Sequence, residues 1–322
     1  MRLEGGRFVV VGGAGLIGSH TVDLLLAAGV AEVVVFDNLI RGSTDNLTAA
    51  LADNRVRIVQ GDLRDPSDLD PVLSGVDGVF HFAALWLLHC HENPSEGFEV
   101  NVTGSFNLFE ACVRHGVERV VFSSSASVYG DAVTEPMAED HPFANTTVYG
   151  ATKIAGEALL TSFHHRDGLE TVGLRYFNVY GPRQDYKGAY VAVIMKMLDR
   201  LDRGEPPVVF GDGTQSYDFV SVRDCARANL AAMEASVVDR YYNVCTGVKT
   251  SISEVADHLI RLTGQDVEVQ FLPDEASFVR NRIGDPEAAH RDLGFTASAE
   301  LEDGLRELIA WRAEHQRMGS TA

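Results

Sequence analysis

Runs of consecutive apolar residues alternate with amphipathic stretches through the first 180 residues of the chain. Continuous apolar runs are typical of strands that are buried on both faces of a sheet. Apolar positions that recur every three or four residues and stop at a glycine are typical of helices. The alternation predicts an α/β fold with a doubly wound parallel sheet. The expected strands cover residues 8–11, 32–36, 55–60, 78–82, 117–122 and 169–174.

The pattern changes after residue 181, where shorter expected strands and more widely spaced helices follow. This change predicts a second, smaller part of the fold. The predicted parts are a larger domain in residues 1–180 with a return segment of about 217–240, a smaller C-terminal lobe in 181–216 and 241–315, and a disordered tail in 316–322.

Charge and cysteine content narrow the range of functions. The chain has 46 acidic and 27 basic residues, which gives a net charge of −19. Because an acidic surface repels phosphate backbones, we expect no nucleic-acid partner. No apolar run is long enough to span a membrane, and the four cysteines form no CxxC pair and have no histidine at zinc-finger spacing. We therefore expect a cytoplasmic protein with reduced thiols, no membrane partner and no bound metal.

A glycine-rich turn, Gly12 to Gly18, directly follows the first expected strand, and a helix and a second strand ending at Asp37 come after it. Glycines at such a turn let backbone N–H groups approach a pyrophosphate at the helix N-terminus. Asp37 stands close to the distance at which an acid meets an adenosine ribose. The sequence therefore predicts a Rossmann-type dinucleotide site. The acid would repel a 2′-phosphate and favours NAD, while Arg41 nearby leaves NADP open.

Tyr149 and Lys153 stand four residues apart on an expected helix that begins near Thr147. In a helix they share one face, one turn apart. A tyrosine titrates near pH ~10, and a neighbouring ammonium group lowers that pKa. The pair is a candidate proton-transfer device, with an accidental surface pair as the alternative. Other chemistry-bearing residues at the carboxyl ends of the expected strands should converge on the same edge of the sheet, namely Gly12, Asp37, Asp62, Ala84 and Ser125.

These features together resemble the extended short-chain dehydrogenase/reductase superfamily, in its NAD-dependent sugar-nucleotide epimerase/dehydratase branch, over nearly the whole chain. The resemblance implies a retained NAD, a nucleoside-diphosphate sugar as substrate, most of all a UDP-sugar, and a homodimer. The motifs that carry it are Gly12–Gly18, His81-Phe82-Ala83-Ala84, the serine-rich stretch that ends in Val128-Tyr129-Gly130, Tyr149 with Lys153, Arg175–Arg183, and Gly211-Asp212-Gly213.

The resemblance also implies roles for individual residues. Tyr149 is expected to be the catalytic base, Lys153 to hold the nicotinamide ribose and depress the tyrosine pKa, and Ser125 to hydrogen-bond the reacting sugar oxygen. Arg282 is expected to meet the diphosphate, with Arg280 as its competitor. The expected cofactor-binding residues are Gly12, Gly15, Leu16, Ile17, Gly18, Asp37, Asn38, Asp62, Leu63, Phe82, Ala83, Ala84, Asn101, Ser123, Tyr149, Lys153 and Tyr176. The expected substrate-binding residues are Leu85, Trp86, Ser125, Ala126, Tyr149, Phe177, Asn178, Tyr190, Val191, Val208, Gln215, Tyr217 and Arg282.

Two positions after Ser125 distinguish the reactions of this branch. The 4,6-dehydratases carry an Asp-Glu pair there and the decarboxylases a Glu at the second position, whereas this chain has Ala126 and Ser127. Elimination needs a positioned acid and base, so the sequence favours a 4-epimerase, of the UDP-glucose/UDP-galactose or the UDP-glucuronate/UDP-galacturonate type. A dehydratase or reductase is the first alternative. A non-catalytic NAD-binding protein is the second, although such proteins tend to lose the active-site tyrosine or lysine.

The chain departs from the family pattern at Tyr217, where many relatives carry an arginine near the diphosphate. Either Arg183, Lys187 or Arg223 compensates for the lost charge, or these are surface residues. The segment 85–91 is expected to be a packed lid or a wall that faces the sugar, and its two histidines lack a third metal ligand. The helices expected at residues 94–115 and 147–165 suit a four-helix dimer interface, or cover within the monomer.

Overall fold

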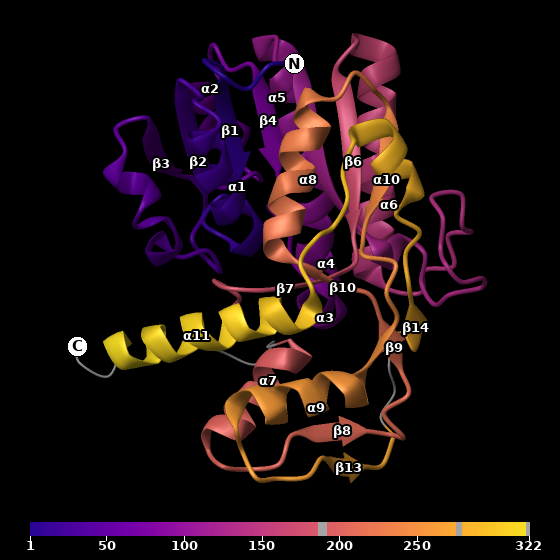
Figure 1. The fold of residues 1–322 in the computed structure, drawn as a ribbon. Coiled ribbons are helices and arrows are strands. Elements are labelled where there is room, and N and C mark those ends of the chain that lie inside the picture. The colour runs from indigo at the N-terminus through magenta and orange to yellow at the C-terminus, as the bar shows by residue number, and fades with distance from the viewer. Residues whose placement is uncertain (186–191, 275–278, 320–322) are drawn as a thin grey trace.

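A seven-stranded parallel sheet forms the centre of the larger domain in a computed structural model that describes residues 1–185, 192–274 and 279–319 (Figure 1). The strand order is β11–β6–β5–β4–β1–β2–β3. At the centre of the sheet Val9 of β1 lies opposite Val34 of β2 and Val79 of β4, and all three side chains are buried. The strands are β1 (Arg7–Val11), β2 (Glu32–Asp37), β3 (Val56–Gln60), β4 (Gly78–His81), β5 (Arg119–Ser125), β6 (Glu170–Tyr176) and β11 (Arg240–Val244).

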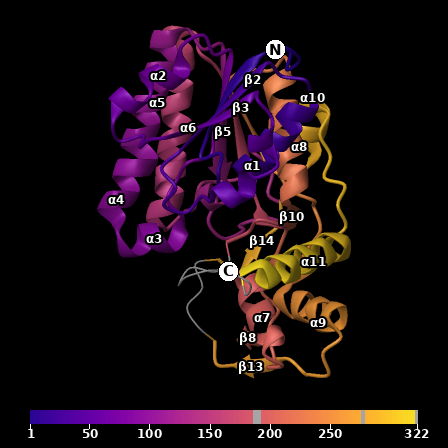
Figure 2. The same cartoon turned by 90° about the vertical axis from the view of Figure 1, so that its left-hand side faces the viewer.

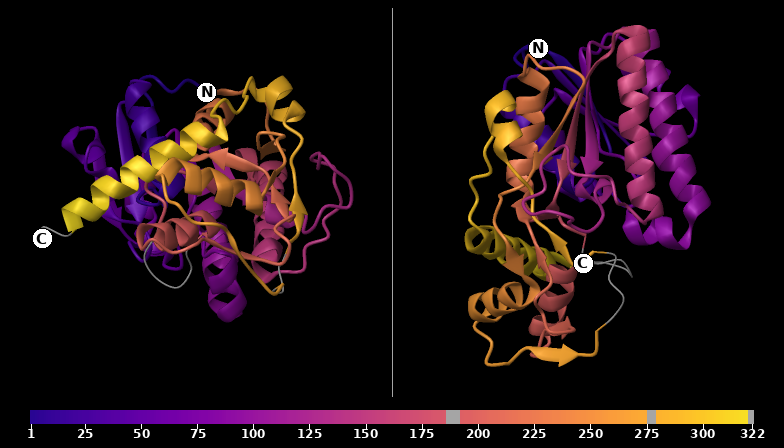
Figure 3. Two further views of the ribbon diagram at one scale, coloured as in Figure 1. Left: turned by 60° about the horizontal axis from the view of Figure 1, so that its bottom comes forward. Right: turned by 90° about the vertical axis from the view of Figure 1, so that its right-hand side faces the viewer.

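Helices cover both faces of this sheet (Figures 2 and 3). Because each face is covered, residues on both sides of a strand are buried, which is why the strands read as continuous apolar runs. The doubly wound α/β class predicted from the sequence is therefore confirmed. One face carries α1 (Leu16–Ala27), α8 (Val222–Glu234) and α10 (Glu287–Leu293), and the other carries α2 (Asp70–Leu73), α5 (Ser105–His115) and α6 (Val148–Asp167).

Three segments precede α5 and follow the carboxyl end of β4. They are α3 (Leu87–Glu92), α4 (Pro94–Phe98) and a π-helical stretch, Glu99–Gly104. The helix expected at residues 94–115 is thus interrupted by one wider turn, and π-helical turns are frequent at functional sites. Short 3₁₀ turns occupy Thr44–Leu47, Ala50–Ala52, Pro66–Asp68 and Ala126–Val128.

The smaller lobe lies beyond the carboxyl edge of the sheet (Figure 1). A pair of short strands, β7 (Asn178–Tyr180) and β10 (Phe219–Ser221), leads from the sheet into the lobe. Its own apolar core contains Met197, Val255 and Leu305, all buried. The other elements are α7 (Val193–Asp202), α9 (Ile252–Thr263), α11 (Leu301–Gly319), the pair β8 (Val208–Phe210) and β13 (Gln270–Leu272), and the three-stranded set β12 (Thr250–Ser251), β9 (Ser216–Tyr217) and β14 (Asn281–Arg282).

The boundaries of the lobe differ from the sequence prediction in two places. Residues 241–244 were expected in the lobe, but they belong to β11 at the edge of the large sheet, where Tyr242 and Val244 are buried. The tail expected from residue 316 begins within α11, which continues to Gly319. No helix in the described part of the chain is both long and apolar enough to cross a membrane.

Candidate active site

A cavity of about 260 Å³ opens at the carboxyl ends of β1, β2, β3 and β4. Parallel sheets bind their ligands at this edge, outside the ends of the strands. The cavity brings together most of the residues expected to bind a dinucleotide. These are Gly12, Gly15, Leu16, Asp37, Asn38, Asp62, Leu63, Phe82, Ala83 and Ala84.

The glycine turn at the floor of this cavity depends on close backbone approach. Gly12 has a left-handed φ of 77°, and a Cβ on Gly18 would lie 2.3 Å from the Gly12 carbonyl oxygen. Larger residues at these two positions would therefore push the turn apart. Helix α1 begins directly after Gly15, which provides no side-chain cap. The first N–H groups of the helix remain available for a phosphate at the cavity.

Asp37 ends β2 and is held by two backbone hydrogen bonds at the cavity wall. The Ala14 N–H donates to Oδ2 at 3.0 Å, and the Leu39 N–H donates to Oδ1 at 2.9 Å. Burial raises the pKa of this carboxyl. The side chain of Arg41 points elsewhere: its guanidinium lies 3.9 Å from the centre of the Trp86 ring. The carboxyl is thus fixed where an adenosine ribose would meet it.

Two polar atoms without a partner also line this cavity, and neither residue was expected there from the sequence. Arg183 pairs with Asp23 through Nη2 at 2.7 Å, but its Nη1 is buried with no hydrogen-bond partner. The Oε1 of Gln184 is likewise buried and unsatisfied. Buried polar groups of this kind normally find partners. A dinucleotide fits this cavity, because it offers the phosphate and hydroxyl groups that these atoms lack.

Lys153 lies almost fully buried on α6 beneath the end of β5. Its Nζ donates a hydrogen bond to the Ser123 carbonyl at 2.6 Å and lies 5.7 Å from the centre of the Tyr149 ring. Burial lowers the pKa of Lys153 to about 8. The ammonium group is therefore held between the serine-rich strand end and the candidate base.

Tyr149 interacts with the Ser125 hydroxyl, which favours its ionised form. Burial outweighs this interaction and raises the pKa of Tyr149 to about 12. The sequence prediction was that Lys153 depresses the tyrosine pKa, and in this structure the net shift is upward. The physical reason is that desolvation penalises the phenolate more than the Ser125 hydroxyl supports it.

Local structure explains why Ser125 and Tyr149 meet. Ser125 ends β5, and its Oγ accepts a hydrogen bond from the Ser127 N–H at 3.1 Å at the start of a 3₁₀ turn. Thr147 caps α6 by accepting from the Gly150 N–H at 3.0 Å. A Cβ on Gly150 would lie 2.5 Å from the Ser127 carbonyl oxygen. This glycine therefore lets the start of the helix approach the turn closely.

A second cavity, of about 210 Å³, lies beside this turn and contains Arg282. The guanidinium is within 3.5 Å of the Ser127 Oγ and 3.3 Å of the Gly130 carbonyl, and its Nε is buried without a partner. Burial lowers the pKa of Arg282 to about 10. The residues that line this sugar-sized cavity are Leu87, Ser127, Gly130, Asn145, Thr146, Thr147, Asn178, Tyr217, Val279 and Arg282.

A third cavity, of about 650 Å³, lies in the smaller lobe and shares Asn178 and Tyr217 with the second. Tyr217 is fixed by a hydrogen bond from its hydroxyl to the Val279 carbonyl at 2.7 Å. Arg280 faces this larger cavity and pairs with Asp274, whereas Arg282 faces the smaller one. The 650 Å³ cavity is also lined by Val208, Gln215, Lys196 and Phe210. Asn178 and Tyr217 therefore line both cavities, and we call this shared boundary the neck.

Several residues that were expected to bind cofactor or substrate do not themselves line any of the three cavities. Asn101, in the π-helical stretch, exchanges two hydrogen bonds with the backbone of Leu85 and donates a third to Thr152. Tyr176 is buried and donates to Asn229. Phe177 is buried against Gly284. Ile17 and Gly18 lie at the start of α1, Ser123 and Ser125 at the end of β5, and Ala126 in the 3₁₀ turn that follows.

The segment expected to be a lid or a sugar-facing wall is divided between the cavities. Leu85 and Trp86 were expected to bind substrate, but they line the first cavity, and Leu87 lines the second. His89 pairs with Glu96. In the described part of the chain, no group of three or more His, Cys, Asp or Glu residues could hold a metal ion.

Three expected residues lie outside the described part of the chain: Tyr190 and Val191, named as substrate-binding, and Lys187, named as a compensating charge. Of the other compensating candidates, Arg223 pairs with Glu307 and is 64% exposed, so it is a surface residue. Arg183 lines the first cavity.

Comparisons with known proteins agree with this geometry. A model of the NAD dependent epimerase/dehydratase family matches residues 8–245. The UDP-glucose 4-epimerase of Bacillus subtilis is 33% identical over 335 residues, covering 95% of this chain and 97% of that protein.

Two solved structures show the same fold. The UDP-N-acetylglucosamine 4-epimerase of Methanobrevibacter ruminantium M1, in complex with UDP-N-acetylmuramic acid, has a TM-score of 0.92 and 34% identity, covering 97% of this chain and 99% of that chain. The dTDP-glucose 4,6-dehydratase of Streptomyces venezuelae, with NAD bound, has a TM-score of 0.90 and 30% identity, covering 97% and 98%. Epimerases and dehydratases therefore both share the whole architecture.

Proposed function

Because the chain belongs to the NAD dependent epimerase/dehydratase family, we propose that it is an NAD-dependent 4-epimerase of a nucleoside-diphosphate sugar. The observation that carries this proposal is the chemistry around the second cavity. Ser125 and Tyr149 interact beside it, yet none of the described residues that line it is an Asp or a Glu. A dehydratase needs an acid and a base to remove water. An epimerase needs only a reversible oxidation at one carbon.

The proposed reaction begins when Tyr149 takes the proton of the C4 hydroxyl, directly or through Ser125. NAD held in the first cavity by residues such as Gly12, Gly15 and Asp37 would supply reversible hydride chemistry, so that hydride could leave C4 and return to the opposite face of the sugar. Between these two events the 4-keto sugar turns within the cavity while its nucleotide stays anchored. Tyr149 then gives the proton back, so no atom is gained or lost. Lys153, buried beside the tyrosine, supports the negative charge of the phenolate.

The cavities suggest how the substrate binds. The nucleotide would occupy the 650 Å³ cavity and the sugar the 210 Å³ cavity. The diphosphate would cross the neck at Asn178 and Tyr217, where the buried guanidinium of Arg282 lies on the sugar side. Burying an unpaired cation is costly, and a diphosphate would supply its counter-charge. We infer a UDP-sugar, either a neutral hexose or a uronic acid.

We also infer a homodimer and a cytoplasmic location. Phe98 on α4 and Phe106 on α5 are 56% and 37% exposed, which is unusual for large apolar side chains. The face that carries them suits a four-helix interface with a second copy. All four cysteines have free thiols, which suits a reducing compartment. Light scattering would measure the oligomeric state, and a monomer would contradict the interface.

The domain division that we propose places residues 1–180 with the NAD site, together with the return segment and β11. The remaining residues of the C-terminal half, apart from α10 on the face of the large sheet, form the substrate lobe. Limited proteolysis with and without a UDP-sugar would test it, since the ligand should protect the lobe.

The experiment that tests the function incubates the purified protein, without added NAD, with UDP-glucose, UDP-galactose, UDP-glucuronate, UDP-N-acetylglucosamine and dTDP-glucose. Mass spectrometry and NMR then follow each sugar. Interconversion of a pair with no change of mass supports the proposal. Loss of water or carbon dioxide overturns it in favour of a dehydratase or decarboxylase, and stoichiometric consumption of added NADH indicates a reductase. No change with any sugar would favour a non-catalytic NAD-binding protein.

A further inference from the structure

Polar and aromatic side chains from four separate loops, bridged at one point by His89, form a continuous chain of contacts along the wall of the first cavity. Each loop follows a different strand, namely β2, β3, β4 and β7. We call these seven residues the collar: Asn38, Arg41, Asp62, Arg64, Trp86, Glu96 and Asp185. All seven line the cavity.

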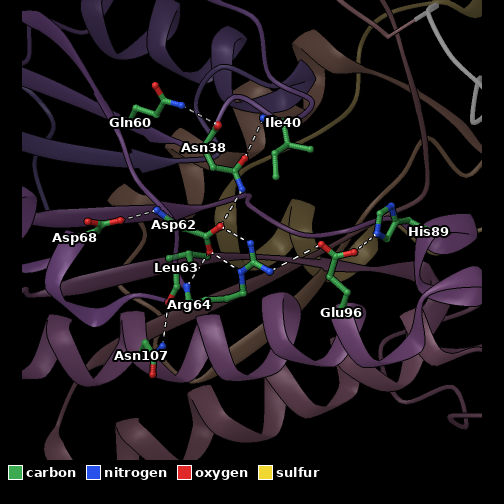
Figure 4. A network of polar contacts seen from close by, with 10 residues as sticks. All are labelled: Asn38, Ile40, Gln60, Asp62, Leu63, Arg64, Asp68, His89, Glu96 and Asn107. Atoms are coloured by element: carbon green, nitrogen blue, oxygen red, sulfur yellow. Dashed lines mark hydrogen bonds and ion pairs between the residues drawn. The ribbon is translucent and has the colours of Figure 1, made fainter.

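The first link of the collar joins the loops after β2 and β3 (Figure 4). Asp62 accepts hydrogen bonds from Arg64 Nε at 3.0 Å and Nη2 at 2.7 Å, and from Asn38 Nδ2 at 3.4 Å. The hydrogen bonds from Arg64 lower the pKa of Asp62 to about 2. The carboxylate is therefore ionised at any working pH and holds Arg64 in a fixed position.

The second link joins the loop after β3 to the helices after β4. Arg64 Nη1 lies 3.9 Å from Glu96 Oε1, and Glu96 Oε2 lies 2.7 Å from His89 Nε2. Figure 4 shows this line of side chains running from Asp62 through Arg64 and Glu96 to His89. The His89 ring contacts the Trp86 ring edge-on at 5.1 Å between centroids. Glu96 thus ties α4 to the β3 loop and, through His89, to the wall that carries Trp86.

The third link returns to the loop after β2. The Arg41 guanidinium covers the Trp86 ring at 3.9 Å, and its Nε lies 3.3 Å from Asp185 Oδ2 in the loop after β7. A cation over an indole ring contributes a favourable electrostatic contact. The loops after β2, β3, β4 and β7 are therefore connected around one cavity.

We propose that this collar controls how long NAD stays bound, with Arg64, Glu96 and Arg41 acting as positioning residues. The links hold together the loops that line the cavity, so we expect a bound adenosine to leave more readily once a link is broken. Breaking one link should leave the fold intact and accelerate loss of the cofactor. The proposal needs only the NAD of the family and no particular sugar reaction, so it and the proposed function can fail separately.

The test measures NAD release from the purified holoprotein carrying Glu96→Gln. This variant keeps the shape of the side chain but removes its charge from both Arg64 and His89. Because the Arg64–Glu96 ion pair is 3.9 Å long and partly exposed, its contribution is modest, and we expect release about 3-fold faster than in the wild type. Glu92→Gln is the matched control, since it removes the same charge from an exposed position on α3. Released NAD is quantified by chromatography after rapid buffer exchange.

Three further measurements separate retention from a general structural effect. Release from the wild type should accelerate with added salt, because partly exposed ion pairs are screened. Arg64→Met should accelerate release less when combined with Glu96→Gln than when introduced alone, because both changes break the same link. Arg41→Met, at the opposite side of the collar, should accelerate release independently of Glu96→Gln. If Glu96→Gln and Arg41→Met release NAD at the rate of the Glu92→Gln control, the collar does not control retention and the proposal is wrong.

Discussion

Replacing Lys153 with methionine should abolish turnover and yet stabilise the NAD-free protein. Lys153 is 3% exposed, and burial lowers its pKa from 10.5 to about 8. A tenfold change in an equilibrium corresponds to about 1.4 kcal/mol, so the buried ammonium costs the folded state about 3 kcal/mol below pH ~8. Methionine has a similar shape and carries no charge. It also loses the hydrogen bond to the Ser123 carbonyl, worth about 1 kcal/mol.

Removing the burial cost and losing the hydrogen bond together should raise the free energy of unfolding of Lys153→Met by about 2 kcal/mol relative to the wild type. For a chain of 322 residues this corresponds to a melting temperature about 3 °C higher. The assay is thermal or urea unfolding of NAD-free protein at pH 6.5. Lys196→Met is the matched control, because Lys196 is exposed on α7 and should shift stability by less than about 0.5 kcal/mol.

The pH dependence of the free energy of unfolding tests independently whether the buried Lys153 ammonium destabilises the fold. The folded-state pKa of Lys153 is depressed, so the unfolded chain binds more protons between pH ~8 and ~10.5. The free energy of unfolding of the wild type therefore rises relative to that of Lys153→Met across this window, so the difference passes through zero before pH ~10.5 and the wild type is then more stable by about 1 kcal/mol, the worth of its hydrogen bond to Ser123. A Lys153→Met protein that is less stable than the wild type at pH 6.5 would refute the reasoning, because the burial cost would then be absent.

The remaining predictions concern the base, the glycine turn and the diphosphate. Tyr149→Phe should lower kcat by about 100-fold or more, since general base catalysis contributes that much, while chromatography still finds bound NAD; unchanged kcat would exclude this base. Gly18→Ala places a Cβ 2.3 Å from a backbone oxygen, so protein expressed in cells should contain less NAD than wild type. Arg282→Met should raise KM for the sugar nucleotide about 10-fold or more, because hydrogen bonds to charged groups are strong. Arg280→Met, which changes an exposed side chain, should raise this KM less. Equal increases of KM would mean that both arginines contact the diphosphate.

The sequence predicted the large sheet because its signals are local. Valine-rich runs, glycines and strand-end acids such as Asp37 each report on their own surroundings. The sequence did not place β11 correctly, because a five-residue strand such as Arg240–Val244 carries no sequence feature that identifies the strand with which it pairs. Its position beside β6 depends on contacts with residues about 70 positions earlier in the chain.

The candidate site was predicted unevenly for the same reason. Ser125, Tyr149 and Lys153 stand in recognisable motifs, and the structure brings them together. Arg183 ends the motif that begins at Arg175, and Gln184 follows it, but their approach to the NAD cavity depends on the turn after β7, where Arg183 has a left-handed φ of 67°. The collar joins positions 144 residues apart in the case of Arg41 and Asp185. Such pairs become visible only when the loops are placed in space.

The opposite pKa shifts of Tyr149 and Lys153 connect stability with function. Burial raises the pKa of the phenol to about 12 and lowers the pKa of the ammonium to about 8, so near pH 7 the NAD-free site holds a neutral phenol beside a cation. A neutral phenol cannot take a proton from a sugar hydroxyl. A further positive charge beside Tyr149, such as an oxidised nicotinamide ring, would favour the phenolate and form the base only when cofactor is present. Because Lys153 is expected to hold the nicotinamide ribose, Lys153→Met should weaken NAD binding while it stabilises the NAD-free fold. If added NAD raised the melting temperature of Lys153→Met as much as that of the wild type, Lys153 would serve neither the cofactor nor the base.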